Sequence, residues 1–91
     1  GKVALVTGAG QRVGRAITEA LAADGYRVGV HYRASAAGAD EVVAGIRARG
    51  GEAEAFAADL GDAGACERLV DAVYTRFDAL DLLVNSAASM E

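Results

Sequence analysis

The sequence predicts an α/β fold, in which a parallel β-sheet is covered by helices on both faces. Short apolar runs alternate with longer amphipathic segments three times, and a fourth apolar run follows. The connections between these segments are short and are marked by glycine, of which the chain has 12, whereas proline is absent. Apolar residues make up 53% of the chain, which is typical of a folded core. Strands that alternate with helices through short loops form right-handed βαβ units, so we expect the strands to be parallel.

The first half of the chain is expected to hold two strands and the helix between them. Val3–Val6 is a continuous apolar run that ends in glycines, which is typical of a strand buried on both faces. The helix is expected over Val13–Asp24 and is stopped by Gly25. Its inward face is expected to consist of Val13, Ile17, Ala20 and Leu21. The second strand is expected over Arg27–Tyr32, where apolar residues alternate with others.

The second half repeats the pattern, with helices expected over Gly38–Arg49 and Asp62–Phe77 and strands over Glu52–Ala57 and Leu80–Val84. The inward-facing helical residues are expected to be Val42, Val43 and Ile46 in the first helix and Leu69, Val70, Val73 and Phe77 in the second. Asp62 is expected to cap the helix that it begins. These connections predict the strand order 3-2-1-4, the first four strands of a doubly wound, Rossmann-type sheet in three layers.

The composition of the 91 residues argues against several classes of function. A formal charge of −4 with scattered arginines gives no basic surface for nucleic acid or an anionic membrane. No apolar run is long enough to span a bilayer, and the run after Lys2 is too short for a signal peptide. Cys66 is the only cysteine, which excludes an internal disulfide and fits a cytoplasmic location. We expect Cys66 to be packed as a small apolar residue on the third helix.

A cluster of glycines follows the first strand directly, in the segment Thr7-Gly8-Ala9-Gly10-Gln11-Arg12-Val13-Gly14. Gly8 permits a tight turn, and Gly14 allows the next helix to lie close to the strand. The free N–H groups and the positive dipole end of that helix suit a pyrophosphate. This placement between strand and helix predicts a dinucleotide site, the alternative being a turn without a ligand. The candidate contacts are Gly8, Gln11, Arg12, Val13 and Gly14.

The end of the second strand indicates which nucleotide fits. An Asp or Glu there would bind the ribose 2′-hydroxyl and repel a 2′-phosphate. Tyr32 occupies that position, and Arg33 and Ser35 follow it with groups that suit a phosphate. We therefore expect a preference for NADP(H), with His31, Tyr32, Arg33 and Ser35 as candidate contacts. For His31 a packed structural role is the favoured interpretation, and for Arg33 the alternative is a surface arginine.

The glycine turn resembles the first motif of the short-chain dehydrogenase/reductase family, Thr-Gly-x-x-x-Gly-x-Gly. Thr7, Gly8 and Gly14 match this motif, and Arg12 stands where the middle glycine usually lies. An arginine here is similar to the pteridine reductases and dihydromonapterin reductases, in which it reaches toward the cofactor pyrophosphate and the substrate. The resemblance implies NADP(H) as the cofactor and a small carbonyl or pteridine compound as the substrate. The alternative for Arg12 is a solvated loop residue.

The resemblance extends to the ends of the third and fourth strands. In the family, an Asp at the position of Asp59 holds the adenine amino group and the next residue, here Leu60, packs on the ring. Asp59 is expected to be free for this role, because Asp62 is the better helix cap. The family pattern Asn-Asn-Ala-Gly corresponds to Asn85-Ser86-Ala87-Ala88, which implies that the asparagine ties the fourth strand to its neighbours. The small third residue lets the backbone approach the nicotinamide ribose, which makes Asn85, Ser86 and Ala87 candidate contacts.

The catalytic residues of the family have no counterpart in this sequence. The chemistry needs a Ser after the fifth strand and a Tyr-x-x-x-Lys motif, whose Tyr gives or takes a proton while hydride moves. Tyr74 has Asp78 four residues on, and Lys2 is the only lysine. We therefore assign no catalytic residue, and the dispersed His, Cys, Asp and Glu predict no metal site.

Residues 1–91 are interpreted as the NADP-binding N-terminal half of a longer NADPH-dependent carbonyl or pteridine reductase. By resemblance, the whole protein is expected to be a homo-oligomer, a tetramer. The fourth strand, rich in Leu and Val, is expected to need a further strand beside it. Two alternatives remain open. One is a non-catalytic NADP-binding or redox-sensing module, complete as it stands, and the other is an interaction domain that uses the fourth strand.

Overall fold

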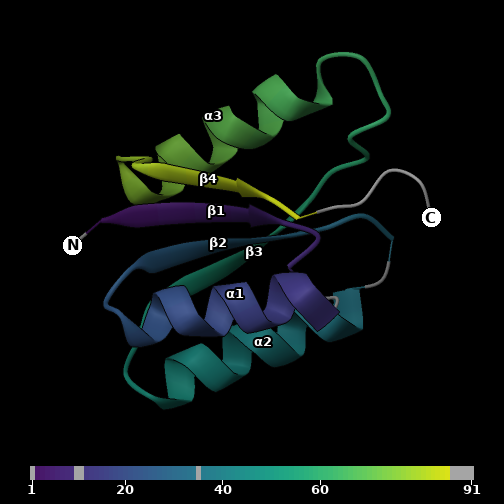
Figure 1. Ribbon diagram of the computed structural model, residues 1–91. Helices are drawn as coiled ribbons and strands as arrows, with labels where there is room; N and C mark the ends of the chain where they lie inside the picture. Colours follow the sequence, from purple (N-terminus) through teal and green to yellow (C-terminus); the bar gives the residue numbers. More distant parts are fainter. Residues whose placement is uncertain (1, 10–11, 35, 87–91) are drawn as a thin grey trace.

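The structure is a computed structural model that describes residues 2–9, 12–34 and 36–86. Its elements, in chain order, are β1 (Val3–Thr7), α1 (Arg12–Ala23), β2 (Arg27–Tyr32), α2 (Ala36–Ala48), β3 (Ala53–Ala57), α3 (Ala65–Phe77) and β4 (Leu82–Asn85). The four strands pair in parallel in the order β3-β2-β1-β4 (Figure 1). The predicted α/β class and strand order are confirmed.

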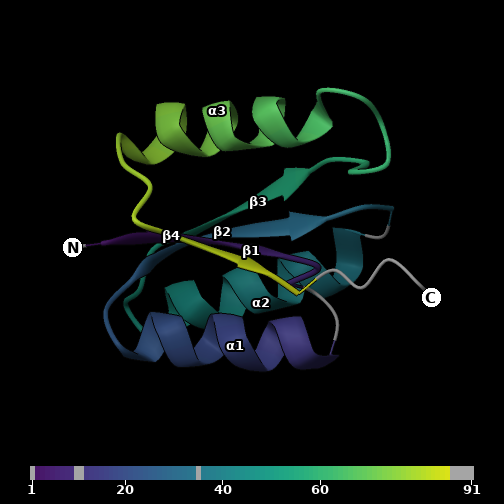
Figure 2. The same cartoon turned by 45° about the horizontal axis from the view of Figure 1, so that its top comes forward.

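The molecule has three layers, with α1 and α2 on one face of the sheet and α3 on the other (Figures 1 and 2). β1 lies between β2 and β4, and all five of its residues are buried. Val6 faces a core shared with α1 and α2, whereas Val3 and Leu5 face a core shared with α3. Burial on both faces explains why this strand is a continuous apolar run.

The inward face of α1 differs from the predicted one. Gly14 and Thr18 are buried, whereas Val13 is 68% exposed and Ala20 also faces solvent. Gly14 lies close against Gly8, in the turn after β1, and the Thr18 hydroxyl donates to the Gly14 carbonyl at 2.7 Å. Ile17 and Leu21 remain on the inner side, as predicted. The close contact at Gly14 was predicted, but the apolar spacing of the helix did not show that Val13 and Ala20 would be left on the solvent side.

The start of α3 and the packing of Cys66 also differ from the predictions. α3 begins at Ala65, and its N-cap is Gly64 at φ 79°, without a side-chain cap bond. Asp62 does not cap it, because its carboxylate lies 3.3 Å from Arg68 Nη2 instead. Cys66 is exposed rather than packed. The predicted inner residues of α2 and α3 are confirmed as buried or half-buried.

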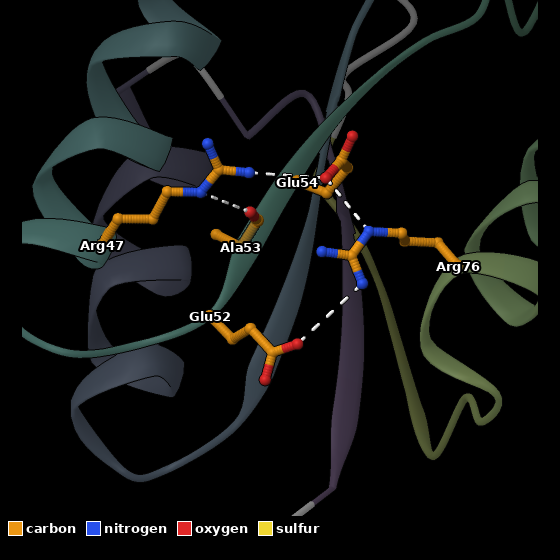
Figure 3. A network of polar contacts seen from close by, with 5 residues as sticks. All are labelled: Arg47, Glu52, Ala53, Glu54 and Arg76. Carbon is orange, nitrogen blue, oxygen red and sulfur yellow. Dashed lines mark hydrogen bonds and ion pairs between the residues drawn. The ribbon is translucent and has the colours of Figure 1, made fainter.

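The outer edge of the sheet, at β3, is covered by a cluster of charged side chains. Arg47 from α2 and Arg76 from α3 reach Glu54 from opposite faces of the sheet (Figure 3). The distances to Glu54 Oε1 are 3.4 Å from Arg47 Nη2 and 3.2 Å from Arg76 Nε. Arg47 Nε also donates to the Ala53 carbonyl at 3.1 Å, and Arg76 Nη1 lies 3.9 Å from Glu52 Oε2. Charge at an edge strand opposes pairing with another strand, so this edge is protected.

Within the described residues, no helix is long and apolar enough to cross a bilayer.

Candidate functional site

The turns that follow the four strands gather at one end of the sheet, where the strands terminate. Figure 1 shows all four strands pointing toward this end of the sheet, where the chain leaves β1, β2, β3 and β4. Open parallel sheets bind ligands outside the carboxyl ends of their strands. The predicted site residues that the structure describes come from these turns. Gln11, Ser35 and Ala87 lie outside the described residues.

The turn after β1 depends on two glycines. Gly8 adopts φ 65°, a left-handed conformation that favours glycine. A Cβ built on Gly14 would lie 2.2 Å from the Gly8 carbonyl oxygen and 2.7 Å from Ser86 Oγ. The predicted close contact between the helix and the first strand is therefore present. It joins the starts of two different turns, those that follow β1 and β4.

The N-terminus of α1 carries a positively charged side chain. Arg12 is the first residue of the helix and is exposed, as is Val13. The first turn of α1, all of it within the described residues, contains no acidic side chain. The helix dipole and the Arg12 guanidinium thus both favour an anion at this point.

The end of β4 is tied to the end of β1. The Thr7 hydroxyl donates to Asn85 Oδ1 at 2.8 Å, and the Ser86 hydroxyl donates to the Thr7 carbonyl. Backbone pairing also matches Thr7 with Asn85. Asn85 therefore makes the predicted tie between strands, and Ser86 adds a second one that the sequence did not indicate.

Burial decreases along the three residues at the end of β2. His31 is buried, Tyr32 is half-buried and Arg33 is exposed. His31 is only 2% exposed, and its ring contacts the backbone of two other turns. Arg33 is 75% exposed at its side chain, and its Nε lies 3.7 Å from Asp59 Oδ1. Arg33 thus lies where a phosphate group can reach it from solvent.

Asp59 is not free of local contacts, which corrects the prediction. Its Oδ1 accepts from the Gly61 N–H at 3.0 Å and faces Arg33. Asp59 thus accepts a backbone hydrogen bond in the turn that precedes α3. Leu60 is half-buried and packs against the core under α3.

A surface hollow of about 190 Å³ lies beside Asp59. It is lined by residues at the end of β3 and the start of α3, among them Phe56, Ala58, Asp59, Asp62, Arg68 and Leu69. This volume is below the roughly 300–1,000 Å³ of pockets for drug-sized ligands, so it suits one ring rather than a dinucleotide.

No group of described residues has the composition of a metal site. Tyr74 is exposed near the end of α3. This end of α3 lies close to the starts of the strands, away from the gathered turns (Figure 1).

Comparison with known proteins identifies the family. The model of the short chain dehydrogenase family matches residues 2–91. The chain belongs to this family. It is 50% identical over 91 residues to an uncharacterized oxidoreductase of Methylorubrum extorquens, covering 100% of this chain and 37% of the relative. It is 45% identical over 86 residues to a 3-oxoacyl-[acyl-carrier-protein] reductase of Synechocystis, covering 94% of this chain and 35% of that enzyme.

Solved structures of family members agree with this assignment. A dehydrogenase/reductase of Sinorhizobium meliloti superposes with a TM-score of 0.93 at 41% identity, over 97% of this chain and 35% of that protein. A dehydrogenase of Burkholderia cenocepacia with bound NADP superposes with a TM-score of 0.86 at 40% identity, over 92% of this chain and 33% of that protein. The short-chain dehydrogenase chain described here thus spans about a third of the length of these relatives.

Proposed function

We propose that this chain is the NADP-binding part of an oxidoreductase that uses NADPH to reduce a carbonyl compound. The observation that carries the proposal is Arg33, an exposed guanidinium directly after β2. It follows Tyr32, which occupies the position where an NAD-binding site has a carboxylate. The solved relative from Burkholderia cenocepacia contains NADP, which supports the same cofactor here.

The described residues fit this cofactor. The left-handed Gly8 turn and the start of α1, with Arg12 and no acidic residue, would hold the pyrophosphate. Arg33 would pair with the 2′-phosphate, and Asp59 would accept from the adenine amino group. Asn85 would face the nicotinamide half, because the turn after β4 lies across β1 from Arg33.

NADPH, when bound, supplies the hydride that a carbonyl reduction needs. This chain's own residues would bind the cofactor and orient it. Buried Gly14 keeps α1 against β1, and Asn85 keeps the end of β4 against Thr7, so the turns that flank the cofactor hold their spacing. The proton that completes the reduction requires a general acid, and no residue of this chain is proposed for it.

The substrate is proposed at the level of its chemical class. Relatives that reduce 3-oxoacyl groups support a ketone carbonyl. Arg12 supports the pteridine alternative, because a cation beside the cofactor phosphates can also contact a polar substrate ring. By resemblance, the whole protein would act in the cytoplasm as a homo-oligomer, without a nucleic-acid or membrane partner.

The proposal is tested by calorimetric titration of the chain with NADPH and with NADH. We expect binding of both, with NADPH preferred by roughly tenfold or more, the value of one charge-assisted pair. A longer protein that contains this chain should then oxidise NADPH with a 3-oxoacyl thioester or with a dihydropteridine, which distinguishes the two substrates. Tight binding without turnover of either would favour the non-catalytic NADP-binding module. Failure of the chain to bind either nucleotide would refute the proposal and favour an interaction domain.

A further inference from the structure

We propose that His31 is a positioning residue for the nucleotide site, because its neutral ring joins the turn that would hold the pyrophosphate to the turn that would hold the adenine. The inference rests on the proposed cofactor. Gly8 N–H donates to His31 Nδ1 at 2.9 Å, and His31 Nε2 lies 2.8 Å from the Ala58 carbonyl oxygen. The imidazole is 2% exposed, so water does not compete for these contacts.

The two partners determine where the ring proton lies. A backbone N–H can only donate and a carbonyl oxygen can only accept, so Nδ1 must carry the lone pair and Nε2 the proton. A second proton on the ring would point from Nδ1 at the Gly8 N–H, and two donors would then face each other in a buried place. The bridge therefore exists in one tautomer of the neutral ring and is broken when the ring is protonated.

The bridge spans the two halves of the nucleotide site. Gly8 begins the turn that leads to α1, and Ala58 directly precedes Asp59. Two backbone bonds lie alongside the ring, from Ala9 N–H to the His31 carbonyl and from Ala58 N–H to the Tyr32 carbonyl, both at 3.0 Å. These bonds hold each turn to β2, and the imidazole adds the direct link between the turns.

No single charge in the described surroundings accounts for this arrangement. β1 carries no charged residue. On the turns after β2 and β3, Arg33 pairs with Asp59 at 3.7 Å. At the start of α3, Arg68 pairs with Asp62 at 3.3 Å. This pair lines the same surface hollow as Ala58 and as Phe56, which is paired with His31 in the sheet.

One further carboxylate lies on β3, at Glu54, and it is held by Arg47 and Arg76. Hydrogen bonding rather than ion pairing therefore fixes the orientation of the His31 ring.

The first test compares three variants. His31→Asn keeps an acceptor near the Nδ1 position, His31→Gln keeps a donor near the Nε2 position, and His31→Phe keeps the ring but neither group. Loss of a buried partner for the Gly8 N–H predicts that His31→Phe binds both NADP⁺ and NAD⁺ roughly 5- to 100-fold more weakly. We expect His31→Asn to recover most of the affinity and His31→Gln little of it, because the Gly8 contact positions the phosphates. Equal affinities in all three variants and the unaltered chain would overturn the inference.

The second test does not require a variant to fold. His31 is the only histidine, so its ring nitrogens give unambiguous ¹⁵N NMR signals. We expect the shifts of an unprotonated Nδ1 and a protonated Nε2, and the opposite tautomer would overturn the inference.

The outcomes separate the inference from the proposed function. Unchanged affinity for both nucleotides in His31→Phe would overturn the positioning role while leaving the cofactor assignment intact. The expected tautomer in a chain that binds neither nucleotide would refute the proposed cofactor, and with it any role of the bridge in nucleotide binding.

Discussion

Replacement of Gly14 by Ala perturbs the contact that joins α1 to two turns of the site. The new Cβ would lie 2.2 Å from the Gly8 carbonyl oxygen and 2.7 Å from Ser86 Oγ, whereas an ordinary contact begins near 3.4 Å. The serine hydroxyl can rotate, but the carbonyl belongs to the backbone and cannot. The helix must therefore move away from β1 by about an ångström, and the turn between them must move with it.

The size of the effect follows from two opposing terms. Forcing a methyl group into a filled contact costs about 1–3 kcal/mol. Ala stabilises a helix by about 1 kcal/mol relative to Gly, which offsets part of that cost. We expect the free energy of unfolding to fall by up to about 2 kcal/mol, a substantial share of the roughly 5–15 kcal/mol that holds a typical domain together.

A matched control is available in α2. Gly45 also lies inside a helix without a positive φ, and a Cβ there would meet nothing within 4 Å. Gly45→Ala should therefore raise stability by about 0.5–1 kcal/mol through helix propensity alone.

Urea unfolding followed by far-UV circular dichroism measures both variants. Calorimetric titration with NADP⁺ should show weaker binding for Gly14→Ala and unchanged binding for Gly45→Ala. If Gly14→Ala is as stable as Gly45→Ala and binds NADP⁺ normally, the close contact between α1 and β1 has no energetic importance and the reasoning is refuted.

Three further results are expected. Glu54→Gln should lower stability by less than about 1 kcal/mol, because its pairs with Arg47 and Arg76 are exposed, and added salt should reduce the difference from the unaltered chain. Asp71→Asn, which removes one negative charge from an exposed site in the middle of α3, is the control in urea unfolding. Leu83→Lys should reduce self-association in light scattering across a concentration series, because Leu83 is 48% exposed on β4, and equal scattering by both proteins would contradict this. The 91-residue chain should bind NADPH without oxidising it in the presence of ketones or pteridines, because it has no Tyr-x-x-x-Lys motif, and sustained loss of NADPH absorbance would contradict this.

The fold was predictable because hydrophobic pattern and glycine placement both reflect burial in a parallel sheet. Val3–Val6 is apolar throughout because it lies at the centre of the sheet, and that position follows from the order of the strands. Gly8 and Gly14 were identified for the conformational and steric reasons that the structure shows.

Other features depend on tertiary contacts that no local pattern encodes. The sequence could not show that Val13 faces solvent while Gly14 is buried, because Gly14 also meets Ser86, which follows β4. Asp62 stands at a plausible capping position by sequence alone, but α3 begins at Ala65 after Gly64, and it is Asp59 that accepts a backbone N–H in the preceding turn.

The predicted site is coherent in space, but its internal ties were missed. His31 contacts Gly8 and Ala58, which lie 23 and 27 residues away along the chain. A lone histidine at a strand end carries no sequence signal for such a bridge. The sequence did contain a signal for the contact between Arg33 and Asp59, because these residues follow two neighbouring parallel strands and therefore lie at the same end of the sheet.

The central claim, that this chain binds NADP through the end of β2, is tested most directly by charge reversal at Arg33. The ratio of NADP⁺ to NAD⁺ affinity is measured by calorimetry for Arg33→Asp and for the control Arg49→Asp. The control makes the same charge change in the connection between the end of α2 and the start of β3, at the end of the sheet where the strands begin. Loss of a charge-assisted pair should lower NADP⁺ affinity by about 10- to 100-fold. Arg33→Asp should then prefer NAD⁺, because a carboxylate accepts from the 2′-hydroxyl, while Arg49→Asp should keep the original preference. Equal binding of the two nucleotides by the unaltered chain, or the same ratio in both variants, would contradict the claim.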